Sequence, residues 1–123
     1  MAADRPHKRL DAWNLSMELC REVYALCQRL PREERYGLGA QMKRAAVSVP
    51  SNIAEGAARG TSKEFAHFLS VAQGSLAELD SQLELCSAYL GLIDREEAAK
   101  VLEKAARVGR MITALRRSLE HRK

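Results

Sequence analysis

The chain has 123 residues, of which 46% are hydrophobic, 29% are charged and only 5% are aromatic. This length fits a single domain, and the share of apolar residues excludes an intrinsically disordered chain. No apolar run reaches the length of a membrane span, and the N-terminal residues lack the apolar stretch of a secretory signal. We therefore expect a cytoplasmic protein without a membrane segment.

A first helix is predicted from Asp11, a candidate N-cap, to about Leu30, where Pro31 ends it. It carries two apolar stripes, although packing against one neighbour needs only one. One stripe consists of Leu15, Leu19, Val23, Leu26 and Leu30, and the other of Trp13, Met17, Cys20, Tyr24 and Cys27. The second stripe needs a partner of its own, either a neighbouring helix or another subunit.

A second helix is predicted over about residues 38–59, with Pro50 inside it. A proline in a helix removes one backbone hydrogen bond and costs roughly 3 kcal/mol, so we expect a kink that tertiary contacts hold in place. A polar cluster is expected around it and on the facing third helix: Ser48, Ser51, Asn52, Glu55, Arg59, Ser75 and Glu78. We interpret the cluster as a hydrogen-bonded network that braces the kink, with a ligand or partner site as the alternative.

Thr61 and Glu64 have the spacing of a capping box, which begins a third helix that ends near Gly91. Asp94 is a candidate N-cap for a fourth helix. Both helices carry apolar seams whose residues alternate three and four positions apart. The third helix has Phe65, Leu69, Ala72, Leu76, Leu79, Leu83, Cys86 and Leu90, and the fourth has Val101, Ala105, Val108, Ile112, Leu115 and Leu119.

Four helices with short connections predict an all-α, antiparallel up-down-up-down four-helix bundle. It should occupy residues 11–121, preceded by a flexible basic arm at residues 1–10. The predicted third helix is longer than the first, which leaves apolar surface at one end of the bundle. Together with the second stripe on the first helix, this surface predicts a homo-oligomer.

The sequence offers little for catalysis. Glu64 and His67 have the Glu-x-x-His spacing of di-iron bundles, but no second pair accompanies them, so we interpret both as surface positions. Cys20, Cys27 and Cys86 lack the spacing of a zinc site and are expected to be small packing residues. We therefore predict a protein that is not an enzyme and that requires no metal or cofactor.

Positive charge is concentrated near the C-terminus, where residues 94–123 carry nine basic and five acidic side chains. The basic side chains of the fourth helix lie away from its seam, at Lys100, Lys104, Arg107, Arg110, Arg117 and Arg122. One interpretation is an ordinary solvated helix face. The other is a surface that binds the phosphate backbone of RNA or another nucleic acid in a salt-dependent manner, without reading bases.

Several short runs resemble one protein family. They are R-A-A-V-S-V-P-S-N-I-A-E-G at residues 44–56, Arg59, Glu64-Phe65, Phe68-Leu69, G-S-L-A-E-L at residues 74–79, L-D-A-W at residues 10–13 and Y-G-L at residues 36–38. In these runs the chain resembles the bacterial four-helix-bundle proteins called 23S rRNA intervening sequence proteins. The resemblance implies a small bundle that assembles into a homopentameric ring and is often encoded within insertions in ribosomal RNA genes.

The leading hypothesis from the sequence is a non-enzymatic oligomeric bundle that binds RNA or another nucleic acid through basic surfaces. Its expected partners are further copies of the chain, and RNA or a nucleic-acid-associated protein, with no membrane. The alternative hypothesis is a protein-interaction scaffold or accessory subunit that has no direct role with nucleic acid.

Overall fold

The computed structural model describes residues 5–121. Within this range the chain forms four α-helices and no β-strand, which confirms the predicted all-α class. The helices are α1 (Asp11–Cys27), α2 (Leu38–Ala58), α3 (Ser62–Glu84) and α4 (Arg95–Glu120). Short 3-10 segments at Pro6–Arg9 and Arg32–Glu34 precede α1 and α2, and a π-helical segment, Leu85–Tyr89, continues α3.

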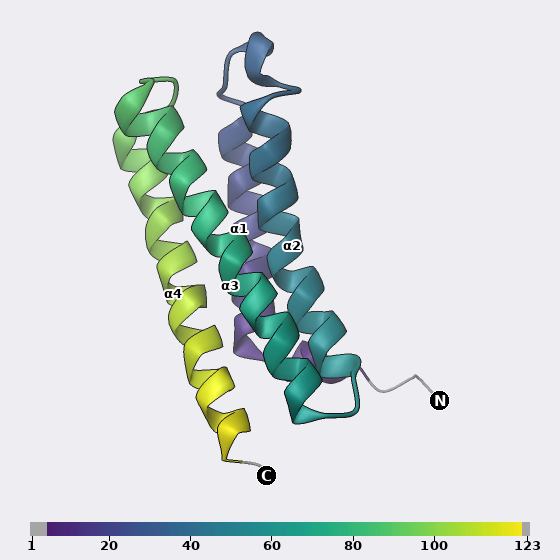
Figure 1. The fold of residues 1–123 in the computed structure, drawn as a ribbon. Coiled ribbons are helices and arrows are strands. Elements are labelled where there is room, and N and C mark those ends of the chain that lie inside the picture. Colours follow the sequence, from purple (N-terminus) through teal and green to yellow (C-terminus); the bar gives the residue numbers. More distant parts are fainter. Residues whose placement is uncertain (1–4, 122–123) are drawn as a thin grey trace.

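The four helices lie side by side (Figure 1). The α1–α2 and α3–α4 connections lie at one end of the molecule, and the α2–α3 connection lies at the other. Helices α2 and α4 each contact both α1 and α3. None of the helices in residues 5–121 combines the length and the apolar character needed to cross a membrane.

A single hydrophobic core lies between the helices and contains the first stripe of α1. Its largest fully buried apolar side chains are Leu19, Val23, Met42, Val49, Ile53, Leu69, Leu79, Leu83, Val108 and Ile112. Phe65 and Leu115 of the predicted seams are only partly buried. Periodicity alone therefore located most of the core residues of α1, α3 and α4, because a helical seam is a local property of the sequence.

Leu90 is an exception, since it is 50% exposed although its spacing placed it in the α3 seam. The N–H of Leu90 donates to the carbonyl oxygen of Leu85, five residues earlier, at 2.8 Å. A turn with this i→i+5 bond is wider than an α-helical turn, so it shifts the register of the residues that follow. The π-helical segment thus turns Leu90 outward, while Ser87 is buried near the end of the helix.

Three of the predicted helix starts can be compared with the structure. Thr61 Oγ1 accepts the N–H of Glu64 at 3.1 Å, and Asp94 Oδ2 accepts the N–H of Glu97 at 3.1 Å, so these two caps are confirmed. Asp11 is instead the first residue of α1, whose N-cap is Leu10 without a side-chain hydrogen bond. Helix α1 also ends at Cys27, before the predicted Leu30, and a turn connects the two.

Part of the arm expected at residues 1–10 lies outside the described residues, which begin at Arg5. Pro6–Arg9 form a 3-10 segment that contacts both α1 and α2. The ring of His7 packs edge-on against the ring of Trp13, with 4.9 Å between centroids. Trp13, a member of the second α1 stripe, is therefore partly covered by His7.

Helix α2 continues through Pro50, which is buried. Because proline has no N–H, the carbonyl of Ala46, four residues earlier, lacks its helical donor. Cys20 on α1 supplies a donor from outside the helix, with its Sγ 3.1 Å from the oxygen of Ala46. The sequence predicted that the polar cluster around Pro50 would satisfy this backbone, whereas the group that reaches the carbonyl comes from α1.

Candidate nucleic-acid interface and polar cluster

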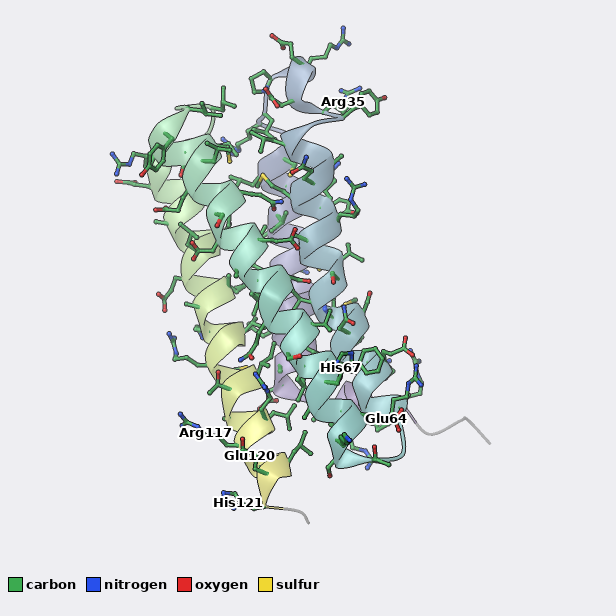
Figure 2. The ribbon with its side chains drawn as sticks, in the orientation of Figure 1. Arg35, Glu64, His67, Arg117, Glu120 and His121 are labelled. Atoms are coloured by element: carbon green, nitrogen blue, oxygen red, sulfur yellow. The ribbon has the colours of Figure 1, made fainter. Side chains whose placement is uncertain are left out.

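The outer face of α4 carries most of the predicted basic side chains. Lys100, Arg107, Arg110 and Arg117 are exposed, while Arg122 lies outside the described residues. The α4 seam packs into the core, so the opposite side of the helix remains in solvent. Arg117 lies on the C-terminal part of α4 (Figure 2), and Arg110 and Arg117 both line a groove between α4 and α3.

Lys104 does not belong to this exposed face. Its ammonium group lies against the carboxylates of Glu22 and Glu18 on α1, with Nζ 3.4 Å from Glu18 Oε1, and its side chain is only 19% exposed. The hydrogen bond with Glu22 is the main reason why the pKa of Lys104 is raised above its usual value. Lys104 therefore connects α4 to α1 and is unavailable to an external anion.

The remaining cations differ in their pairing. Arg110 lies 3.5 Å from Glu103 Oε1, and both side chains are about two-thirds exposed, at 66% and 68%. An ion pair in solvent of this kind contributes little to stability and is easily replaced. Lys100, Arg107 and Arg117 form no ion pair within residues 5–121. The face thus presents three unpaired cations and one weakly paired cation.

Arg116 belongs to α4 but was not among the predicted site residues. Its Nη1 donates to Gln73 Oε1 on α3 at 2.5 Å, and Gln73 Nε2 donates to Thr113 Oγ1 at 2.9 Å. Arg116 is partly buried in this contact. On a helical wheel it lies beside the α4 seam, and this position could have indicated that it faces a neighbouring helix.

The polar cluster divides into two separate groups. In the first, Ser75 Oγ on α3 donates to Ser48 Oγ on α2 at 2.8 Å, which joins the two helices. Asn52 Nδ2 donates to Ser48 Oγ at 2.9 Å and to the Ser48 carbonyl oxygen at 2.8 Å. Ser51 and Glu78 are exposed and take no part in this network.

The second group lies where α2 ends and α3 begins. Arg59 Nη2 donates to Glu55 Oε2 at 2.8 Å, and its Nη1 lies 3.5 Å from Glu64 Oε2. The guanidinium also stacks over the ring of Phe68, 5.1 Å from its centroid. All three charged side chains are roughly half exposed, so this group orders the turn more than it stabilises the core.

Glu64 and His67 are both exposed, at the N-terminal end of α3. Glu120 and His121 lie at the C-terminal end of α4, and Figure 2 shows the two pairs at the same end of the molecule but on separate helices. Among residues 5–121, no three or more His, Cys, Asp or Glu side chains come close enough together to hold a metal ion.

The three cysteines are all free thiols. Cys86 is buried and the other two are partly buried. Burial raises the pKa of Cys20 to about 11, and it also raises the pKa of Cys27 and Cys86. At neutral pH the thiols are therefore protonated, which suits the packing and hydrogen-bonding roles that their positions indicate.

The second stripe of α1 remains largely uncovered in its middle. Met17 is 46% exposed and Tyr24 is 45% exposed, while Trp13, Cys20 and Cys27 are partly buried. Lys43 Nζ on α2 lies 4.9 Å from the centroid of the Tyr24 ring. Within one chain, the neighbouring helix thus covers only part of the stripe.

Residues 8–114 match the model of a protein family that is described as 23S rRNA-intervening sequence protein. No curated protein matches the sequence. The matched range contains all of α1, α2 and α3 and most of α4, together with both groups of the polar cluster. Since this range covers most of the chain, the protein belongs to the 23S rRNA-intervening sequence protein family.

Proposed function

We propose that this protein is a non-enzymatic bundle that binds nucleic acid through the outer face of α4. The observation that carries the proposal is the row of exposed cations, among which Lys100, Arg107 and Arg117 have no ion-pair partner within residues 5–121. Cations without partners can neutralise phosphates and release their counterions, which is the main source of sequence-independent affinity. The family description names an intervening sequence of 23S rRNA, which makes RNA the first ligand to test.

The mode of binding follows from what α4 contains. No residue in Arg95–Glu120 is aromatic, so this face has no side chain on which an unpaired base could stack. Recognition therefore rests on phosphate charge and tolerates different sequences. With four phosphates contacted per chain, the slope of log K against log salt concentration should be about −3 on single-stranded RNA.

Fluorescence anisotropy with labelled RNA, measured from about 50 to 200 mM salt, tests this proposal. The double variant Lys100→Gln/Arg107→Gln should bind more weakly and reduce the slope by about 1, and neither residue lines the α3–α4 groove. Arg35→Gln is the control, because Arg35 is exposed but lies at the opposite end of the molecule from Arg117 (Figure 2). No binding at the lowest salt concentration, or an equal loss in the control, would contradict the proposal.

Self-association is the second part of the proposed function. A groove of about 970 Å³ lies between α3 and α4 and is lined in part by Ala77, Ala106, Gly109 and Ala114. Small residues such as these allow another helix to approach closely. Arg110 and Arg117 of the basic face also line the groove, whereas Lys100 and Arg107 do not. We propose that the exposed α1 stripe of a second copy occupies the groove, in a head-to-tail contact that closes into a ring. Five copies per ring is the number that the family resemblance implies.

Charge and position support this contact. Arg21 is exposed on α1 between Met17 and Tyr24, on the same side of the helix. Asp80 is exposed on α3 and lines the groove. When the two apolar side chains enter the groove, Arg21 can therefore pair with Asp80. The repeating unit is the antiparallel up-down-up-down bundle, which the alternating connections support (Figure 1).

Light scattering tests the assembly. The proposed ring has a mass about five times the 13.7 kDa of one chain. Gly109→Met should reduce the mass by filling the groove, because a Cβ at Gly109 meets only Leu76 Cδ1, at 3.8 Å. Gly109→Ala is the matched control that is too small to block a helix. A wild-type protein that is monomeric at all concentrations would contradict this part of the proposal.

A protein-interaction scaffold is the second candidate function. It is supported by large apolar side chains at the end of α3, where Leu85, Tyr89 and Leu90 are 41%, 80% and 50% exposed. A stoichiometric protein partner that co-purifies despite nuclease treatment would favour this function. A cytoplasmic location agrees with both candidates and with the three free thiols.

A further inference from the structure

A cavity beside the α1–α2 connection has no role in the proposed function. Its volume is about 390 Å³, and no residue of α4 lines it. The end of α1, the 3-10 turn and the start of α2 all contribute to its lining, which includes Cys27, Gln28, Arg32, Arg35, Gly39 and Lys43. Three of these side chains are cations, and no acidic side chain of residues 5–121 lines the cavity. Figure 2 shows Arg35 at the opposite end of the molecule from Arg117.

The 3-10 turn places its two arginines on one side. The N–H of Arg35 donates to the carbonyl oxygen of Arg32 at 3.1 Å, which closes the turn. Residues i and i+3 are eclipsed in this conformation, so the two side chains leave the backbone in the same direction. Glu33 and Glu34 lie between the arginines in the sequence and therefore leave the turn on its other sides.

The turn is held against the start of α2. Leu30 is buried, and its Cδ1 would lie 3.5 Å from a Cβ on Gly39. The carbonyl oxygen of Glu34 would lie only 3.1 Å from the same Cβ, so the close approach depends on the absence of a side chain at Gly39. Lys43 follows Gly39 by four residues and lies on the same face of α2. The three cations therefore converge from two elements that are packed together.

These cations have no anionic partner in the described part of the chain. The side chains of Arg32 and Arg35 form neither a hydrogen bond nor an ion pair there. Lys43 Nζ lies 4.9 Å from the centroid of the Tyr24 ring but pairs with no carboxylate. Like charges that line one small cavity repel each other, and an anion that binds between them relieves the repulsion.

The start of α2 adds to the positive potential. Its N-cap, Gly37, has no side chain to accept a hydrogen bond, and no acidic residue lies in the first turn. The N–H groups of that turn therefore keep the partial positive charge of a helix N-terminus. Gly39 belongs to this turn and lines the cavity, so the partial charge adds to the full charges of the three side chains.

We propose that this cavity binds a terminal phosphate, the group at the end of a phosphate monoester. Such a group carries a charge of about −1.5 to −2 at neutral pH and presents three acceptor oxygens. Arg32 and Arg35 bind these oxygens through their guanidinium groups, whose planar donors match phosphate, and Lys43 supplies a third positive charge. Gln28 offers a neutral amide donor from the end of α1.

The charges of the cavity favour a monoester over other ligands. An internal phosphodiester of RNA carries a single negative charge and two substituents, so it neutralises fewer of the converging cations. A zwitterion finds no carboxylate in the lining to pair with its ammonium group. The same terminal phosphate occurs in free nucleotides and at the end of a phosphorylated RNA, and either source supplies the group that the cavity binds.

Calorimetry and NMR titration of the full chain with adenosine monophosphate, AMP, test the proposal in a phosphate-free buffer of low salt. The expected Kd is below about 1 mM. Cyclic AMP has the same base and sugar but a singly charged diester, so it should bind at least about tenfold more weakly. The NMR shifts should be confined to the α1–α2 connection and the adjoining turns. Failure of AMP to bind at about 10 mM, or equal binding of both nucleotides, would overturn the proposal.

Variants connect the binding to the cavity. Arg32→Gln and Lys43→Gln should each weaken AMP binding at least about tenfold. Arg44→Gln is the matched control, because Arg44 follows Lys43 on α2 and is exposed but does not line the cavity. Affinity that is unchanged in both cavity variants, or reduced equally in the control, would contradict binding at this site.

RNA distinguishes the two sources of the phosphate. If the natural ligand is an RNA end, RNA with a terminal phosphate should bind more tightly than the same RNA with a terminal hydroxyl, and Arg32→Gln should remove the difference. If the ligand is a small ester, AMP should bind while the two RNAs bind alike. Both results support the cavity as a monoester site, whereas binding of neither AMP nor the phosphorylated end overturns it.

Hydroxyl-ended RNA also separates this site from the α4 face. Arg35→Gln should weaken AMP binding and leave the affinity for hydroxyl-ended RNA unchanged. The double variant Lys100→Gln/Arg107→Gln should do the reverse, since neither residue lines the cavity. The proposed function and the phosphate site can therefore fail independently. A loss of AMP affinity in the α4 double variant would contradict the phosphate site.

Cys27 provides a readout inside the cavity. Burial raises the pKa of its thiol, and the charge of Lys43 partly offsets this rise. A bound phosphate covers the thiol and opposes the effect of Lys43, so AMP should slow the reaction of Cys27 with iodoacetamide. Mass spectrometry of peptides measures the rate, with Cys20, which does not line the cavity, as the internal control. An unchanged rate at Cys27 under saturating AMP would exclude binding in this cavity.

Discussion

The thiol of Cys20 on α1 donates to the carbonyl oxygen of Ala46 on α2, with 3.1 Å between sulfur and oxygen. Ala46 is fully buried, and its carbonyl is the one that Pro50 deprives of a helical donor. A helix that contains a proline is therefore completed by a side chain from its neighbour. The contact also fixes α1 against α2 at the middle of the core.

This relationship predicts that Cys20 and Pro50 are energetically coupled. Cys20→Ala should lower the free energy of unfolding by about 1–3 kcal/mol, because it leaves a buried carbonyl without a donor. In Pro50→Ala, the restored N–H can bond to Ala46, so Cys20→Ala should cost less in that background. Urea unfolding of the two single variants and the double variant measures the coupling.

Cys27→Ala is the matched control for this cycle. Its Sγ lies 3.8 Å from the carbonyl oxygen of Gly39, which retains its helical donor because no proline follows four residues later. Removing Cys27 should therefore show no coupling to Pro50→Ala. Strictly additive effects of Cys20→Ala and Pro50→Ala would contradict the proposed role of the thiol.

Cys20 also marks the limit of what the sequence could predict. The core seams and the caps at Thr61 and Asp94 depend on residues a few positions apart, so periodicity and spacing were sufficient to locate them. The bond from Cys20 to Ala46 joins residues 26 positions apart, and it depends on how α1 and α2 align. No local pattern contains that information.

The candidate site, too, could be predicted from the sequence only in part. Helical spacing placed the basic residues away from the α4 seam, and Lys100, Arg107, Arg110 and Arg117 are exposed there. It could not show that Lys104 meets Glu18 and Glu22, which lie 86 and 82 positions earlier. Nor could it show that Gln82 Oε1 has no hydrogen-bond partner within residues 5–121, because this depends on how the helices pack.

Lys104 and Lys100 should respond in opposite ways to loss of charge. Lys104→Met should lower the free energy of unfolding by about 1 kcal/mol, since two carboxylates of α1 lose their partner, while RNA binding remains unchanged. Lys100→Met should leave stability within about 0.5 kcal/mol and weaken RNA binding. Thermal melts measure the stability of the two variants, and anisotropy measures their RNA binding. A variant Lys104→Met that loses RNA affinity while Lys100→Met keeps it would contradict the prediction.

The raised pKa of Lys104 adds a dependence on pH. The folded protein holds this proton more tightly than the unfolded chain does, so the stabilisation is complete below the ordinary value of 10.5. It is lost as the pH rises through the higher pKa of the folded state. The stability difference between wild type and Lys104→Met should therefore shrink above about pH 10.5 in denaturant titrations, and a difference that grows with pH would exclude this linkage.

The serine contact between α2 and α3 predicts unequal effects within the polar cluster. Ser75→Ala should lower the free energy of unfolding by about 1 kcal/mol, because it breaks the bond to Ser48 at a buried position. Ser51→Ala, at an exposed position, should change it by less than about 0.5 kcal/mol. Urea unfolding of both variants would reject this account if the two losses were equal.

Two glycines in the helices should respond to alanine in opposite directions. Gly56 faces α3, and a Cβ there would lie 2.9 Å from Phe65 Cδ1 and Phe68 Cβ and 3.2 Å from the Phe65 carbonyl oxygen. Gly56→Ala must therefore push the helices apart, and overpacking of this kind costs typically about 1–3 kcal/mol.

Gly74 lies in the interior of α3, and a Cβ there meets no atom within 4 Å. Gly74→Ala should stabilise the protein by up to about 1 kcal/mol, because alanine loses less conformational entropy in a helix. Thermal and urea unfolding of both variants measure the difference, and a Gly56→Ala variant as stable as wild type would show that α2 and α3 can separate without cost.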